Sequence, residues 1–257
     1  MGYSRSLLNV RANQQNGEAP AVDQQHKVVS HDEWLEARKA LLAREKEFSR
    51  QREALARERR DLPWEEVTKD YTFDGPGGKL TLADLFDGRG QLVVYHFMYP
   101  PDWDAGCPHC SFWADSFEGA PVHLAARDVT FAAVSRASMA QIAAYKKRMG
   151  WSFTWVSAAG TDFNYDFGAS FTPESLADGT AVYNYAAGSP GFSDREGISV
   201  FCRDSAGRLF HTYSTYARGI DMVNGTYQFL DLVPKGRDEP PDDTQFWVRR
   251  RDEYGAD

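Results

Sequence analysis

The stretch Gln91-Leu-Val-Val-Tyr-His-Phe-Met98, followed after a short loop by Cys107-Pro-His-Cys110, decides the fold of this 257-residue chain. The first stretch is nearly continuous in apolar and aromatic side chains, as expected for a strand that is buried on both faces. The second opens a helical pattern that runs to about Ala126. We therefore predict a strand that leads into a helix, with two cysteines at the helix start.

The segments beyond this junction continue the alternation of strand and helix. Residues 129–135 read as a second buried strand, residues 138–149 as a helix, and residues 153–156 as a short third strand. Strands joined by helices favour a parallel βαβ arrangement. Two alternating runs at 198–203 and 208–213 predict a β-hairpin that completes the sheet.

The two cysteines carry the predicted chemistry. A CxxC motif beside a βαβ pattern is typical of a thioredoxin-like fold, an α/β fold whose central mixed sheet is flanked by helices. At the helix start, unpaired backbone N–H groups and the helix dipole favour the thiolate of Cys107. Cys110 lies one turn further on, within reach to resolve a mixed disulfide. Pro108 suits the first turn, and His109 can carry positive charge or donate a hydrogen bond beside the sulfur.

The predicted activity is thiol–disulfide exchange, with Cys107 as nucleophile, Cys110 as resolving residue and His109 as the residue that tunes the pair. Its substrate would be a thiol or disulfide, either a protein or a small molecule. No cofactor is expected.

The remaining segments surround this core. Residues 1–30 are polar and rich in Gln and Asn, and they read as a flexible arm. Residues 31–62 contain no Gly or Pro and read as a long amphipathic helix. Residues 63–233 would form the thioredoxin-like domain, with an irregular insertion at about 159–196. Residues 234–257 are a charged C-terminal tail, expected to drape over the surface.

The predicted N-terminal helix has a narrow apolar stripe. Trp34, Leu41, Phe48 and Leu55 recur at seven-residue intervals, but polar residues fill the second seam position that a coiled coil requires. We interpret the segment as a helix that lies across its own domain. The alternative is an arm that embraces a second subunit, which would give a homodimer and, as a third class of function, a non-catalytic interaction protein.

Charge and hydropathy exclude several partners. The net charge of −8 argues against nucleic acid and anionic membranes, because both would repel the chain. No apolar run approaches the roughly 20 residues that span a bilayer. The N-terminal residues lack the apolar stretch and cleavage site of a secretory signal, so the expected compartment is the cytoplasm.

Three cysteines are too few for a disulfide framework, and a CxxC in a reducing compartment indicates redox chemistry or metal binding. The metal alternative is a copper or zinc module that uses Cys107, Cys110 and a histidine, with His211 as the candidate. If Arg203 pairs with Arg208 in the predicted hairpin, Cys202 and His211 share a face, and a one-residue slip reverses this. We expect Cys202 to be a small buried residue and assign it no role.

Several short motifs support a family resemblance. They are Tyr95-His-Phe-Met98, Cys107-Pro-His-Cys-Ser-Phe-Trp-Ala-Asp115, Ala133-Val-Ser-Arg136, Arg148-Met-Gly-Trp151, Asp162-Phe-Asn-Tyr-Asp-Phe-Gly168, Thr212-Tyr-Ser-Thr-Tyr-Ala-Arg-Gly219 and Asp231-Leu-Val-Pro-Lys-Gly-Arg237. From about Trp34 to Tyr254, the chain resembles a bacterial family catalogued as a domain of unknown function. That family is thioredoxin-like and allied by fold to the peroxiredoxin and alkyl hydroperoxide reductase group. The resemblance implies redox positions at Cys107 and Cys110 and supplies no substrate.

Cys-Pro-His-Cys also resembles the active-site sequence of periplasmic disulfide oxidases, from which the chain differs in two places. It has no signal peptide, and Gly197 stands directly before the strand at 198–203, where thioredoxins carry a cis-proline. Asp104 also stands where the peroxiredoxin motif has a threonine. The comparison therefore argues against thioredoxin-style recognition of protein disulfides and against a peroxidase of the peroxiredoxin type.

Overall fold

The computed structural model describes residues 26–255. Contacts divide the chain into two units, residues 1–47 and residues 48–257. Most of the predicted N-terminal arm lies outside the described residues. The described part of the first unit consists of a short lead-in and the N-terminal part of helix α1 (His31–Arg60).

Helix α1 begins where the sequence supplies a capping box. The backbone N–H of Ser30 donates to Glu33 Oε2 at 3.0 Å, and the N–H of Glu33 donates to Ser30 Oγ at 3.3 Å. No residue of α1 is buried. Its predicted apolar stripe is between 47% and 66% exposed at Trp34, Leu41, Phe48 and Leu55.

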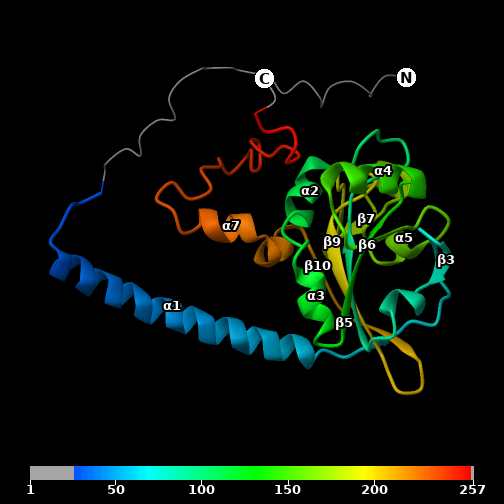
Figure 1. Cartoon of the computed structure of the whole chain (residues 1–257), viewed down its shortest axis with the longest axis horizontal. Coiled ribbons are helices and arrows are strands. Elements are labelled where there is room, and N and C mark those ends of the chain that lie inside the picture. Colours follow the sequence, from blue (N-terminus) through cyan, green and yellow to red (C-terminus); the bar gives the residue numbers. More distant parts are fainter. Residues whose placement is uncertain (1–25, 256–257) are drawn as a thin grey trace. The chain divides into compact units, whose positions relative to one another are not determined.

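The second unit is built on an eight-stranded mixed sheet of order β1-β10-β9-β4-β5-β6-β2-β3 (Figure 1). Strand β4 (Gln91–His96) lies at its centre, parallel to β5 (Val129–Ser135), which is in turn parallel to β6 (Thr154–Ser157). On its other side β4 pairs antiparallel with β9 (Gly197–Arg203), which forms a hairpin with β10 (Leu209–Tyr216). A central strand with parallel crossovers on one side and a hairpin on the other is the thioredoxin-like arrangement, so the predicted fold class is confirmed.

Short strands extend both edges of this sheet. Strand β1 (Glu65–Glu66) pairs with β10, and the hairpin of β2 (Thr72–Gly75) and β3 (Gly78–Thr81) attaches to β6. A 3₁₀ turn, η1 (Asp84–Phe86), leads from this hairpin toward β4. The turn Pro76-Gly77 joins the two strands of this hairpin.

The helix predicted from Cys107 to about Ala126 is two helices. Helix α2 (Pro108–Ala114) ends early, and α3 (Ala120–Ala125) begins with Pro121 in its first turn. A proline inside one continuous helix would clash with the carbonyl four residues earlier, whereas in a first turn its missing N–H costs nothing. Helix α4 (Met139–Met149) forms as predicted, with Ser138 and Gln141 in a capping box.

The insertion contains more regular structure than its composition suggested. It holds α5 (Phe163–Asp166), α6 (Pro173–Ala177) and a separate hairpin of β7 (Ala181–Tyr183) and β8 (Ala186–Gly188). The residues that turn this hairpin, Asn184 and Tyr185, both have left-handed backbone, with φ of 50° and 65°.

Two short helices follow β10 and are separated by one residue. A 3₁₀ helix, η2 (Ala217–Val223), is followed by α7 (Gly225–Leu230). Asn224 separates them because its extended backbone ends the first, while its side chain accepts the N–H of Tyr227 and caps the second.

The sheet separates two apolar clusters, because successive side chains of a strand point to opposite faces. Tyr95 of β4 belongs to the cluster that contains Cys107 and Cys110, and we call this side the cysteine face. Leu92 and Val94 belong to the cluster on the other side, the opposite face. The dithiol is therefore built on one face only.

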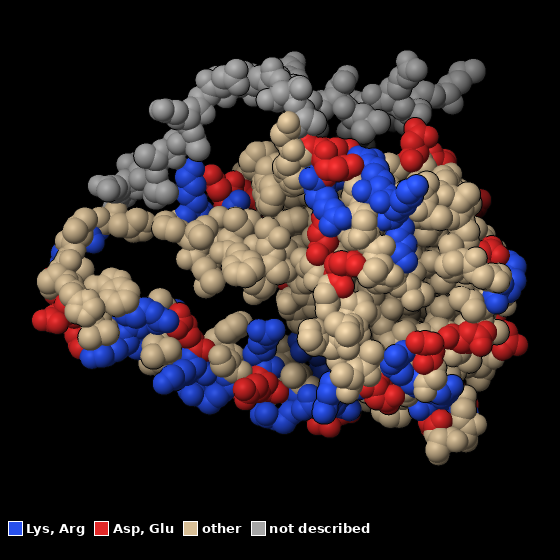
Figure 2. Space-filling view, viewed as in Figure 1, with Lys and Arg blue, Asp and Glu red and all other residues tan. Residues whose placement is uncertain are grey.

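Charge does not segregate on the side shown in Figure 2, where basic and acidic side chains lie beside one another. Within residues 26–255, no helix combines the length and the apolar character needed to cross a bilayer.

Candidate active site

Cys107 is held at the junction of the loop and helix α2. Its backbone is extended, with φ −54° and ψ 129°, and Pro108 occupies the first turn of the helix. Its N–H donates to the carbonyl of Met98 at 3.1 Å, which ties the loop back to the end of β4. Its carbonyl accepts from Ser111 N–H at 3.0 Å and from Ser111 Oγ at 2.8 Å. The backbone on both sides of the sulfur is thus fixed.

Both thiols of the motif are free and almost inaccessible. Cys107 is 6% exposed and Cys110 is 2% exposed. The sulfur of Cys110 accepts a hydrogen bond from the N–H of Met98 at 3.4 Å. A charge on either sulfur therefore depends on hydrogen bonds from the protein rather than on water.

The two thiols have opposite acidities. A hydrogen bond from Cys110 holds the pKa of Cys107 below its usual value, with help from the backbone N–H groups of Cys110 and His109 and against the effect of burial. Burial, and then the hydrogen bond to Cys107, raise the pKa of Cys110 well above the usual value. The pair therefore favours one thiolate, on Cys107, and one thiol, on Cys110.

His109 is a neutral neighbour of this pair. Burial is the main reason why its pKa lies below the usual value, and Arg195 and Arg249 lower it further while Glu196 opposes them. The prediction that a positive charge on His109 stabilises the thiolate is therefore disfavoured at neutral pH. The residue contributes its backbone N–H to Cys107 instead.

Glu196 is a site residue that the sequence did not reveal. Its charge raises the pKa of both cysteines, so it lies close enough to oppose the thiolate. Tyr183 fixes it by donating to its carboxylate at 3.1 Å and to its backbone carbonyl at 2.9 Å. Glu196 directly precedes Gly197, which stands where thioredoxins have a cis-proline facing the disulfide. That neighbouring position is the signal in the sequence from which Glu196 could have been identified. No peptide bond is cis in residues 26–255.

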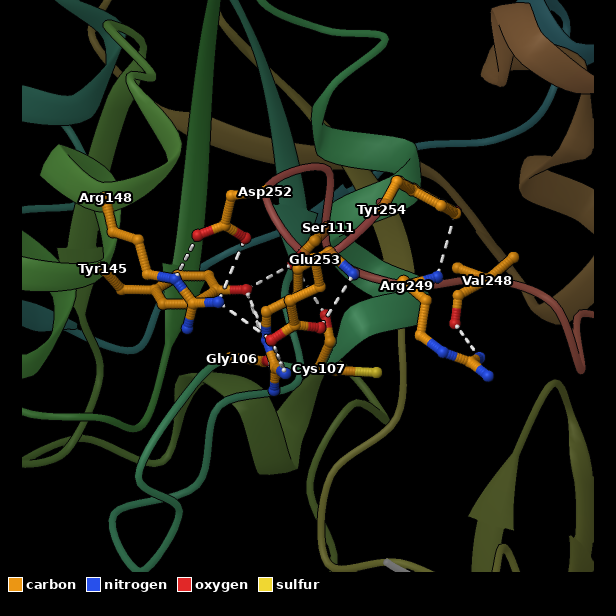
Figure 3. Close-up of polar contacts among 11 residues, drawn as sticks. Gly106, Cys107, Ser111, Tyr145, Arg148, Val248, Arg249, Asp252, Glu253 and Tyr254 are labelled. Carbon is orange, nitrogen blue, oxygen red and sulfur yellow. Dashed lines mark hydrogen bonds and ion pairs between the residues drawn. The ribbon is translucent and has the colours of Figure 1, made fainter. Parts of the chain in front are cut away.

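The C-terminal tail packs against the start of α2, and we call residues 247–253 the C-terminal clasp (Figure 3). Arg250 donates to the carbonyl of Gly106 through Nε at 3.1 Å and Nη2 at 2.8 Å, and to Tyr145 Oη at 3.0 Å. Val248 is only 3% exposed and belongs to the cysteine-face cluster. Among its described residues the tail forms turns and no helix or strand, and Arg250 anchors it beside the dithiol.

Ion pairs with helix α4 also hold the clasp. Arg148 of α4 contacts Asp252 at 2.6 Å and Glu253 at 2.9 Å. In Figure 3 the sulfur of Cys107 points away from Tyr145, so these contacts hold the backbone around the sulfur rather than the sulfur itself.

The predicted register of the second hairpin is wrong by one residue. Arg203 pairs with Leu209, not Arg208, and His211 therefore lies opposite Phe201 on the opposite face of the sheet. The ligand set of Cys107, Cys110 and His211 is not assembled. Within the described range, no group of three or more His, Cys, Asp and Glu side chains is arranged to hold a metal ion.

Cys202 also lies away from the reactive pair. It pairs with Gln91 at the start of β4, whereas the CxxC motif follows the other end of that strand. It is partly rather than fully buried, so the prediction of a buried residue is only approximate. Its pKa is raised, first by burial and then by Asp204.

Comparison with known proteins gives one family. The family described as "Bacterial protein of unknown function (DUF899)" matches residues 23–254. No curated protein matches the chain.

Solved structures that resemble the chain include members of the peroxiredoxin group. The peroxidoxin BcpB of Mycobacterium tuberculosis is 14% identical, covers 64% of this chain and 95% of its own, and has a TM-score of 0.44. Peroxiredoxin Q of Xanthomonas campestris is 14% identical over 65% of this chain and 94% of its own, with a TM-score of 0.45. A hypothetical protein from Sinorhizobium meliloti is 16% identical over 66% and 85%, with a TM-score of 0.37.

The tight packing before the dithiol generates a prediction for Gly106→Ala. The added Cβ would lie 2.7 Å from ring carbons of both Phe97 and Tyr145, which are buried and cannot withdraw freely. We expect the free energy of unfolding to fall by about 1–3 kcal/mol, as for other overpacked cores. Urea unfolding monitored by tryptophan fluorescence measures the change.

The matched control is Gly77→Ala, because a Cβ at that turn meets nothing within 4 Å. The packing argument fails if both variants unfold at the same urea concentration.

Proposed function

This chain belongs to the family described as Bacterial protein of unknown function (DUF899), and from its own residues we propose that it is a thiol–disulfide oxidoreductase acting through Cys107 and Cys110. The observation that carries the proposal is the opposite shift of the two thiol pKa values, downward at Cys107 and upward at Cys110. A nucleophilic thiolate beside a proton-bearing resolving thiol is what exchange with a disulfide requires.

The exchange proceeds in two steps. The Cys107 thiolate attacks one sulfur of a substrate disulfide, which forms a mixed disulfide and releases the other substrate sulfur as a thiolate. Cys110 then gives up its proton to that leaving thiolate and attacks the Cys107 sulfur. This step closes the Cys107–Cys110 disulfide and releases the second substrate thiolate. Two electrons have passed from the dithiol to the substrate, and the reverse sequence oxidises a substrate dithiol.

The surroundings of the pair assign roles to its neighbours. Cys110 and the N–H groups of the first turn stabilise the Cys107 thiolate, while Glu196 destabilises it and keeps the pair from becoming too weak a reductant. A less stable thiolate makes the dithiol more reducing. The pKa of Cys107 is lowered overall, so the donors outweigh Glu196 and make the dithiol less reducing than the Glu196 charge alone would make it.

Disulfide exchange itself is tested with insulin as substrate and a dithiol as electron source. The Cys107→Ser variant should lose catalysed reduction entirely, because it removes the attacking sulfur. The Cys110→Ser variant should accumulate a mixed disulfide that mass spectrometry detects. Cys202→Ser is the control and should keep full activity, since that residue lies at the far end of β9. Unchanged reduction by Cys107→Ser, in a preparation that is clearly active, would reject the proposed function.

The source of the thiolate's stability is tested by the pH dependence of alkylation with iodoacetamide. In Cys110→Ala the donor to Cys107 is lost, so the alkylation midpoint of Cys107 should move to higher pH. Cys110→Ser keeps a hydroxyl donor at the same place and should retain most of the lowered value.

Removing the charge of Glu196 should have the opposite effect on the same measurement. In Glu196→Gln the Coulombic repulsion is gone, so the midpoint of Cys107 should move to lower pH. Glu174→Gln, an equal change of charge at an exposed residue, should leave it in place. If Cys110→Ala and Glu196→Gln both show the same alkylation midpoint as the parent protein, the assigned hydrogen bond and charge do not control the reactivity of Cys107.

A homodimer through α1 is a separate part of the proposal, supported by the exposed stripe that contains Trp34, Leu41 and Phe48. If two copies pair along this stripe, the protein sediments as a dimer and Leu41→Glu converts it to a monomer, because the charge would be buried in the interface. Cys107→Ser should leave the dimer intact. Sedimentation of the parent protein as a monomer at high concentration would contradict this pairing.

A further inference from the structure

A chain of hydrogen bonds crosses three strands on the opposite face of the sheet. His96 Nε2 lies 2.9 Å from Ser199 Oγ, Ser199 Oγ lies 2.8 Å from Ser214 Oγ, and Ser214 Oγ lies 2.7 Å from His211 Nε2. The proposed thiol chemistry uses none of these residues. The inner end of the chain is buried, with His96 only 1% exposed.

Asn164 sets the direction of this chain. Its carbonyl oxygen Oδ1 lies 3.0 Å from His96 Nδ1, and an oxygen of this kind only accepts, so Nδ1 carries the hydrogen. Burial lowers the pKa of His96 to about 4, so the ring is neutral and its Nε2 accepts. A serine has one hydroxyl hydrogen. Ser199 therefore donates to His96, Ser214 donates to Ser199, and His211 donates to Ser214 through Nε2.

This direction leaves an acceptor at the outer end of the chain. A neutral His211 whose Nε2 carries the hydrogen has a lone pair on Nδ1. The nearest partner of Nδ1 is Glu65 Oε2 at 3.5 Å, and a carboxylate oxygen is also an acceptor. In the neutral form of His211, Nδ1 and Glu65 Oε2 are thus two acceptors 3.5 Å apart. A hydrogen-bond donor on a bound ligand, above all a cationic one, would satisfy both His211 Nδ1 and Glu65 Oε2.

These two acceptors lie on the wall of a cavity of about 600 Å³. The volume is in the range of small-molecule sites. Three acidic residues, Glu65, Glu66 and Asp166, line it against one basic residue, Lys69. Lys69 is already held by Asp166 at 2.6 Å, so its charge is compensated within the wall. The cavity therefore favours a positively charged occupant.

Aromatic rings form much of the remaining wall, and one of them is held at a conformational cost. Tyr185 turns the β7–β8 hairpin with φ of 65°, a left-handed conformation that is unfavourable for a bulky residue and natural for glycine. Its ring is 73% exposed, and its hydroxyl donates to the carbonyl of Ser214 at 2.9 Å. A tyrosine in place of the more stable glycine indicates that the ring itself is used.

We propose that this cavity binds an organic ammonium ion with an apolar body. The ammonium group donates to His211 Nδ1 and Glu65 Oε2, and the apolar body packs against the tyrosine rings, Tyr185 among them. The site is on the face of the sheet away from the cysteines, and its occupation does not depend on the thiol chemistry.

Calorimetric titration with phenethylamine tests the proposal, with phenethyl alcohol and hydrocinnamate as neutral and anionic matches. We expect the amine to bind at least about tenfold more tightly than the alcohol, because a hydrogen bond from a charged donor is stronger than one from a neutral hydroxyl. The anion should not bind. Equal binding of amine and alcohol, or no binding of the amine, would overturn the proposal.

Two variants locate the site. Glu65→Gln should weaken amine binding and leave alcohol binding unchanged, whereas Glu174→Gln, at an exposed residue outside the cavity wall, should change neither. Tyr185→Gly should weaken binding while the thermal midpoint stays the same or rises, since Asn-Gly suits this turn better than Asn-Tyr. A loss of binding that follows a loss of folding would count against a role for the ring.

Two further measurements separate this site from the dithiol and check its premise. Cys107→Ser should bind the amine like the parent protein. The binding result is therefore independent of the proposed redox function. Nitrogen NMR of the histidine rings should show His211 Nδ1 without a hydrogen in the free protein at neutral pH. A protonated Nδ1 in the free protein would mean that His211 and Glu65 satisfy each other, and the proposal would be rejected.

Discussion

One proton held between two buried sulfurs is the interaction on which the site depends. Neither Cys107 nor Cys110 has enough contact with water for solvation to stabilise a thiolate, because both residues are at most 6% exposed. The Cys110 thiol supplies the donor that water would otherwise supply, and it does so only while both backbones stay in place. The surrounding contacts can be understood from this requirement. Met98 fixes both residues, Ser111 fixes the carbonyl of Cys107, and the clasp fixes the residue before it through Arg250.

Strand β4 distributes the polar chemistry of the protein between two faces. The period of two along a strand places Tyr95 toward the cysteines and His96 toward the hydrogen-bond chain on the other side. Tyr95 lies 3.4 Å from the carbonyl of Cys110, whereas His96 contacts Asn164 and Ser199, so the two systems are adjacent in sequence and separate in space. The two hydrogen-bond systems therefore share one central strand without sharing a residue.

The sequence predicted what local signals control. The apolar run of β4, the CxxC motif after it and the helix over residues 138–149 depend on neighbouring residues, and all are found. The break at Pro121 was also visible locally, but the helical pattern around it outweighed one proline. The hairpin register was not visible, because a shift of a single residue leaves the alternation unchanged while moving His211 to the other face. Arg250 could not be predicted, since it meets Gly106 across 144 positions and only the tertiary fold brings them together.

The charges around the dithiol show why hydrogen bonds, rather than net potential, set its reactivity. Glu196 opposes the thiolate, burial opposes it as well, and the neutral ring of His109 does not compensate them with a positive charge. The pKa of Cys107 is nevertheless lowered, so the short-range donors outweigh both opposing effects. A Coulombic field changes gradually with distance, but a hydrogen bond is lost within a fraction of an ångström. The reactivity of Cys107 is therefore controlled by the geometry of the helix start, and whatever shifts the clasp or the loop at Gly106 changes the chemistry without changing any charge.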